Sequence, residues 1–84
     1  MDTKETLQKI IRDIASNDSL NIETNSTLKH DLGLSSIDVL RLIDKVQSEF
    51  NFTFETQDYN DENFESIGSI ISLVDKRKVK ENAG

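Results

Sequence analysis

Three stretches of this chain place apolar residues at the spacing of one helix face, and this patterning limits what the chain can fold into. A helix with one apolar face is stable only when that face packs against another element. We therefore expect an all-α fold, a small four-helix bundle with three main helices, forming one domain over residues 1–84. The apolar positions of the three stripes are Leu7, Ile10, Ile11 and Ile14, then Val39, Leu42, Ile43, Val46 and Phe50, then Ile67, Ile70, Ile71 and Val74.

The helix boundaries follow from the polar residues beside each stripe. The first helix is expected over residues 3–16 and the second over residues 36–50. Ser66 is a suitable N-cap for the last helix, because its hydroxyl can accept a backbone N–H of the first turn. A short helix of one or two turns is predicted at residues 60–64. Apolar periodicity stops at Val79, so residues 79–84 are expected to form a frayed tail.

The two connections between the main helices carry apolar residues of their own. Residues 17–35 are rich in Asn, Ser, Thr and Asp, which favour turns over helix. A connection this long is expected to be pinned across the core by its five apolar side chains. Residues 51–56 are expected to be extended and to place Phe52 or Phe54, or both, in the core. The five apolar residues of the first connection are Leu20, Ile22, Leu28, Leu32 and Leu34.

Composition excludes several classes of function. The chain has 84 residues, no cysteine and one histidine, so disulfide, thiolate and histidine-based zinc chemistry are not expected. Its net charge of −6 argues against nucleic acid or anionic lipid as a partner. No apolar run approaches the length of a membrane span, and the first residues lack the pattern of a signal peptide. We expect a soluble cytoplasmic monomer that acts as a binding or carrier module.

The boundary between the first connection and the second helix reads Asp-Leu-Gly-Leu-Ser-Ser-Ile-Asp over residues 31–38. Gly33 allows a tight turn, and Ser35 is placed to cap the helix, with Asp38 three residues later. Ser36 then lies in the first helical turn near solvent, where unpaired N–H groups and the helix dipole favour an attached phosphate. No histidine or lysine adjoins Ser36 to activate it as in a serine hydrolase. On residue types alone, the serine pair could serve only for capping.

This octapeptide, followed by the apolar stripe to Phe50, resembles the phosphopantetheine-attachment motif of acyl carrier proteins and peptidyl carrier proteins. Ser36 matches the modified serine, because it precedes an Ile-Asp pair and lies three residues after Gly33. The resemblance covers nearly the whole chain, including the amphipathic first helix, the long connection and the Asn-Phe-x-Ser-Ile sequence over residues 63–67. It implies a four-helix carrier fold.

The resemblance further implies a non-catalytic carrier. A phosphopantetheinyl transferase would move 4′-phosphopantetheine from coenzyme A onto Ser36, and the thiol of that arm would hold acyl or aminoacyl groups as thioesters. Loading enzymes and downstream biosynthetic enzymes would then bind transiently. Ile37 and Leu40 are expected to form a small apolar contact patch for these partners. The residues expected at the recognition face are Asp31, Leu34, Ile37, Asp38, Leu40, Arg41 and Asp44.

Two departures from the fatty-acid-synthesis pattern bear on the pathway. Ser35 replaces an acid often found before the modified serine, and Arg41 and Lys45 place positive charge on the second helix. Both changes alter electrostatic steering by basic partners. We therefore expect a discrete carrier of polyketide, nonribosomal peptide or other specialised biosynthesis. Primary fatty acid synthesis is the alternative within the family, and an acidic helical adaptor without a prosthetic group is the alternative of another class.

A calcium-binding loop is a third interpretation of the acids near the last helix. Asp58-x-Asn60-x-Glu62 begins like such a loop. Its sixth position is Asn63 rather than glycine, and its twelfth is Ser69 rather than glutamate, so the pattern fails. No metal site is expected.

Overall fold

The computed structural model describes the backbone of residues 2–83 and the side chains of residues 2–78. Its elements are α1 (Thr3–Ala15), α2 (Ser36–Phe50), the short 3-10 helix η1 (Thr56–Asp58) and α3 (Ile67–Ala83). The predicted all-α class and the three main helices are confirmed.

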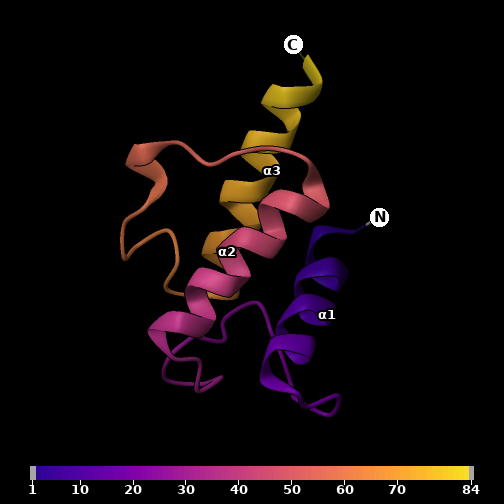
Figure 1. Cartoon of the computed structure of the whole chain (residues 1–84), viewed down its shortest axis with the longest axis vertical. Helices are drawn as coiled ribbons and strands as arrows, with labels where there is room; N and C mark the ends of the chain where they lie inside the picture. Colours follow the sequence, from indigo (N-terminus) through magenta and orange to yellow (C-terminus); the bar gives the residue numbers. More distant parts are fainter. Residues whose placement is uncertain (1, 84) are drawn as a thin grey trace.

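The three α-helices pack into an elongated body with extents of 37 × 26 × 20 Å. Helix α1 runs in the opposite direction to α2 and α3 and packs against both (Figure 1). The long first connection gathers at the end of the molecule where α1 ends and where α2 and α3 begin (Figure 1). The start of α2, which carries the carrier-like motif, therefore lies at this loop-rich end.

The three predicted stripes face the interior. Leu7, Ile11, Leu42, Ile67 and Val74 are each at most 1% exposed. Burying one such side chain contributes about 1.5–3 kcal/mol. The same core includes side chains from both connections, so it is shared between helices and loops.

The first connection is pinned to the bundle, as its apolar residues predicted. Ile22, Leu28, Leu32 and Leu34 are all buried. Two side chains of α1 also bind its backbone: one contact joins Gln8 Nε2 to the Ile22 carbonyl at 3.0 Å, and the other joins Arg12 Nε to the Leu20 carbonyl at 3.0 Å. These contacts fix a segment that has almost no regular structure.

The first connection also caps α3. The N–H of Ile67 donates to the Ser26 carbonyl at 3.0 Å, and the N–H of Gly68 donates to the Thr24 carbonyl at 2.8 Å. The predicted N-cap is confirmed, because Ser66 Oγ accepts the N–H three residues later at 3.2 Å. The N–H groups that a helix start leaves unpaired are thus satisfied partly by the loop.

The second connection differs in part from the prediction. Phe52 and Phe54 are 8% and 5% exposed, so both enter the core as expected. The short helix predicted at residues 60–64 is wrong in position: these residues form turns, and the short helix is η1. The Asn60 side chain accepts the N–H of Asn63 at 2.9 Å, a local bond that favours a turn over a helix.

The end of α3 also differs from the prediction. The helix extends to Ala83, beyond Val79, where the apolar pattern stops. Lysine, glutamate and alanine are strong helix formers, and no glycine or proline intervenes before Gly84. The predicted tail is therefore helical in backbone as far as Ala83, and Gly84 lies outside the described residues.

Candidate functional site

The turn before α2 depends on one glycine. Gly33 has φ +67°, in the left-handed region that glycine adopts without steric cost. A Cβ at this position would meet nothing within 4 Å. Glycine is therefore favoured here by its backbone conformation and not by lack of space for a side chain. On either side, Leu32 and Leu34 are 8% and 4% exposed and anchor the turn to the core. The start of α2 is thereby held in a fixed position.

Ser35 caps α2 through a reciprocal pair of bonds. Its hydroxyl accepts the N–H of Asp38 at 3.1 Å, while its own N–H donates to the Asp38 carboxylate at 3.0 Å. This is the predicted capping box. The backbone N–H and the hydroxyl of Ser35 together hold the pKa of Asp38 below its usual value. The Ser35 hydroxyl is thus engaged in supporting the helix.

Ser36 is the first residue of α2 and is exposed. Within the part of the chain that the structure describes, its Oγ has no hydrogen-bond partner. It lies beside the positive end of a 15-residue helix, where backbone N–H groups favour a phosphate. The surroundings therefore fit a phosphodiester on Ser36, with space outward for a long substituent.

Asp31 is exposed, but its carboxylate has a structural partner. It accepts the N–H of Thr27 at 2.8 Å, while Thr27 Oγ1 accepts the N–H of Asp31 at 3.0 Å. The backbone N–H of Thr27, followed by its hydroxyl, lowers the pKa of Asp31. Asp31 thus braces the turn that leads to Ser36.

The outer face of α2 carries exposed apolar side chains next to Ser36. Ile37 and Leu40 are 63% and 65% exposed, so the predicted exposure of these two residues is confirmed. Arg41 and Asp44 are exposed on the same face. Leu34 does not belong to this face: its side chain is buried in the core, which corrects the prediction that it contacts partners. Leu34 is one of the five apolar residues of the first connection that were expected to pin it across the core, and its burial agrees with that expectation.

A groove of about 740 Å³ runs beside the same end of α2. Its apolar lining includes Val39 and Ile43, which follow Ser36 by three and seven residues and so share its side of the helix. Tyr59 and Phe64 form the opposite wall. Sequence analysis did not find this groove, because no local pattern shows that residues 59–65 return to α2.

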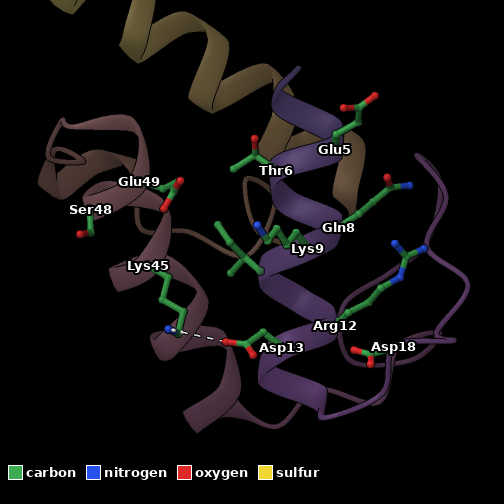
Figure 2. Close-up of a pocket in the computed structure, with 11 residues that line it drawn as sticks. Glu5, Thr6, Gln8, Lys9, Arg12, Asp13, Asp18, Lys45, Ser48 and Glu49 are labelled. Carbon is green, nitrogen blue, oxygen red and sulfur yellow. Dashed lines mark ion pairs between the residues drawn. The ribbon is translucent and has the colours of Figure 1, made fainter. Parts of the chain in front are cut away.

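A second groove, of about 830 Å³, lies between α1 and α2. Figure 2 shows Lys45 of α2 reaching towards Asp13 of α1, and the two charged groups are 4.0 Å apart. Gln8 and Arg12 point from α1 towards the first connection (Figure 2). Ser48 and Glu49 line its α2 side, more than three turns beyond Ser36. This groove lies at the interface of α1 and α2, away from the start of α2.

The acids near η1 have a structural role. Both carboxylate oxygens of Asp58 accept hydrogen bonds from Arg77, which leaves this residue poorly placed to begin a calcium loop. Among the described residues, no group of three or more potential metal ligands was found. None of the helices in this part of the chain is long and apolar enough to span a membrane.

A solved structure shares this fold. It is the crystal structure of Bradyrhizobium japonicum glycine:[carrier protein] ligase complexed with glycylated carrier protein, matched at a TM-score of 0.76 and 24% identity. The match covers 83% of this chain and 95% of that chain. The comparison shows that this chain shares the fold of that helical domain, with an exposed serine at the start of α2.

Sequence comparisons identify the family. Residues 5–74 match the family described as phosphopantetheine attachment site. An acyl carrier protein of Phytoplasma mali is 36% identical over 70 residues, which are 83% of this chain and 81% of that protein. Aminoacyl carrier protein 1 of Bradyrhizobium diazoefficiens is 28% identical over 74 residues, or 87% and 82% of the two chains.

The chain therefore belongs to the phosphopantetheine-attachment family of carrier proteins. Such domains are non-catalytic and bear a covalent 4′-phosphopantetheine group. That group supplies a thiol, which this chain, with no cysteine, does not otherwise have.

Proposed function

We propose that Ser36 is the attachment residue and that a phosphopantetheinyl transferase modifies it. The observation that carries this proposal is the contrast between two adjacent serines: Ser35 Oγ is bonded in the capping box, whereas Ser36 Oγ is exposed and has no partner among the described residues. In the transfer, Ser36 Oγ forms a bond to the pantetheine-bearing phosphorus of coenzyme A. The pyrophosphate bond breaks, adenosine 3′,5′-bisphosphate leaves, and the hydroxyl proton passes to the transferase or solvent.

Mass spectrometry tests the attachment site. The purified apo-protein is incubated with coenzyme A, magnesium and a broad-specificity transferase. The wild type and Ser35→Ala are expected to gain the mass of one phosphopantetheine, and Ser36→Ala is expected to gain none. A mass gain in Ser36→Ala would make Ser35 the site, and no gain in any protein would favour the adaptor without a prosthetic group.

Thiol titration provides a second readout of the same reaction. Because the chain has no cysteine, any thiol on the product belongs to the arm. One thiol per modified chain is expected. The same feature protects a thioester on the arm from attack by a thiol of the protein itself.

We further propose that the carried group is acyl or aminoacyl and that the pathway is specialised rather than primary fatty acid synthesis. The positive charge of Arg41 on the exposed face of α2 supports this choice, as does the similarity to an aminoacyl carrier protein. Mass spectrometry of the protein purified from its native host, with the cargo attached, tests it. An amino acid or specialised acyl group is the expected cargo, whereas a series of saturated fatty acyl chains would support the alternative.

We propose transient docking of the loading and downstream enzymes on the α2 face formed by Ile37, Leu40, Arg41 and Asp44. Two exposed apolar side chains are a small contact area, which suits a carrier that must leave each enzyme after transfer.

A further inference from the structure

The connection between α2 and α3, residues 51–66, is here called the strap. It leaves the end of α2, passes across α3 in the view of Figure 1, and returns beside α2 to the start of α3. Apart from η1 it has no helix of its own. Backbone hydrogen bonds hold its two ends, from the Phe52 N–H to the Gln47 carbonyl and from the Leu28 N–H to the Glu65 carbonyl. Its middle is held by side-chain contacts to α2 and α3.

One side chain of α3 holds the strap at η1. Arg77 donates from Nε to Asp58 at 2.9 Å, from Nη2 to the other oxygen of Asp58 at 2.5 Å, and from Nη1 to Glu55 at 2.8 Å. Arg77 and Asp58 are 8% and 3% exposed. Bidentate, charge-assisted hydrogen bonds of this kind are short and geometrically specific, and removing one partner of a buried pair leaves an uncompensated charge. A single guanidinium thus holds both ends of the short helix.

A side chain of α2 holds the same region from the other side. Gln47 Oε1 accepts the N–H of Phe54 at 2.8 Å and the hydroxyl of Tyr59 at 3.4 Å. The ring of Tyr59 lies 6.1 Å from that of Phe54 and 6.2 Å from that of Phe64. Fixing η1 between α2 and α3 therefore also fixes the aromatic residues that follow it.

These aromatic residues form the wall of the groove that faces α2. The opposite wall, Val39 and Ile43, lies on the same side of α2 as Ser36. The width of the groove beside the modification site is therefore set by where the strap lies. The strap in turn lies where Arg77 holds η1.

We propose that Arg77, with Asp58 and Glu55, is a latch that keeps the strap closed against α2 and sets the width of the groove next to Ser36. When the latch is released, the part of the strap between η1 and Phe64 becomes free to move, while the three α-helices stay folded. The latch stands on contacts within this chain alone. Only its effect on a group carried at Ser36 rests on the proposed function.

The chain provides its own reporter of the strap. Tyr59 is the single tyrosine, and there is no tryptophan, so intrinsic fluorescence comes from the strap. Acrylamide quenching of Tyr59 is measured in the apo-protein, with helix content followed by far-ultraviolet circular dichroism. Because Tyr59 is 48% exposed when the strap is closed, Arg77→Gln is expected to raise the quenching constant up to about twofold by local opening. Lys9→Gln, which removes an exposed positive charge on α1, is the control and is expected to leave quenching unchanged.

Two further variants separate latch release from unfolding. Arg77→Lys keeps the charge but loses the planar fork, so quenching between that of wild type and Arg77→Gln is expected. The double variant Asp58→Asn with Arg77→Gln leaves no buried unpaired charge, and it is expected to open the strap with full helix content. Unchanged quenching in every folded variant would overturn the proposal. So would loss of helix content in step with quenching in all three variants.

The effect on the groove is tested separately with the modified protein. The rate at which the arm thiol reacts with a small disulfide reagent is compared between wild type, Arg77→Lys and Lys9→Gln. A changed rate in Arg77→Lys alone supports the link between latch and groove, and equal rates overturn that link. If Ser36 cannot be modified, the proposed function fails, while the fluorescence test of the latch in the apo-protein is unaffected.

Discussion

Replacing each of the two adjacent serines by alanine is expected to separate stability from modification. Ser35→Ala removes the hydroxyl that accepts the N–H of Asp38 at 3.1 Å. The Asp38 carboxylate can still accept the backbone N–H of residue 35, but the other bond of the capping box is lost. Ser36→Ala removes an exposed hydroxyl without a partner in the described structure. Ser35→Ala is expected to lose stability but still be modified. Ser36→Ala is expected to keep its stability but not be modified.

The magnitudes follow from the contacts. Loss of a serine N-cap costs about 1 kcal/mol, within a range of about 0.5–2 kcal/mol. For a domain of this size, 1 kcal/mol lowers Tm by roughly 4–8 °C. Ser36 occupies the first helical position, where alanine is a better helix former than serine, so Ser36→Ala is expected to change stability by less than about 0.5 kcal/mol.

The assay is thermal unfolding followed by circular dichroism, together with transferase-dependent mass gain on the same samples. Both variants are compared with wild type at one protein concentration and pH. Equal losses of Tm in the two variants would refute the assigned roles, because the structure gives only Ser35 a capping bond. A larger loss in Ser36→Ala would reverse them.

Three other predictions concern separate parts of the structure. Gly33→Ala forces a Cβ into the left-handed region and is expected to cost about 1–2 kcal/mol, measured by urea unfolding; an unchanged midpoint would contradict the conformational argument. Hydrogen bonds from Arg77 hold the pKa of Asp58 below its ordinary value. As the pH falls, the Asp58 carboxylate is therefore protonated at a higher pH in the unfolded chain than in the folded chain. The stabilisation is therefore present above about pH 4 and is lost as the pH falls through the lower folded pKa. Between neutral and acid pH, the urea midpoint of unfolding is expected to change less in Asp58→Asn than in wild type. An identical pH dependence in the two proteins would exclude the Asp58 carboxylate as its origin. Ile37→Asp and Leu40→Asp are expected to slow cargo loading with little change in Tm, because both side chains are exposed; normal loading kinetics would show that enzymes dock elsewhere.

Local patterns in the sequence were sufficient for the helices and for the start of α2. The range of α2, its capping box and the glycine turn before it all depend on residues close together in the chain. The exposure of Ile37 and Leu40 followed from the same helical periodicity. Features of this kind are predictable because their physical causes act over one or two turns.

Long-range contacts account for what the sequence did not show. Arg77 resembles a helix-end cation when read with its neighbours, yet it pairs with Asp58 across 19 residues and is 8% exposed. The true position of the short helix depends on the same pair, since Asp58 ends η1. The groove beside Ser36 likewise forms only when the strap returns to α2. No spacing rule predicts a contact whose partners are brought together by the whole fold.

The structure also narrows the docking face that we propose. Asp31 and Asp38 both have carboxylates bonded to backbone N–H groups, so part of their charge is already compensated. Leu34 is removed from the face by burial. Ile37 and Leu40 remain as exposed apolar contacts, with Arg41 the cation on the face. A partner that complements this face needs an apolar depression with an acid at its edge. A uniformly basic partner surface would meet Arg41 as a like charge, which is why we favour enzymes other than those that select carriers by negative charge alone.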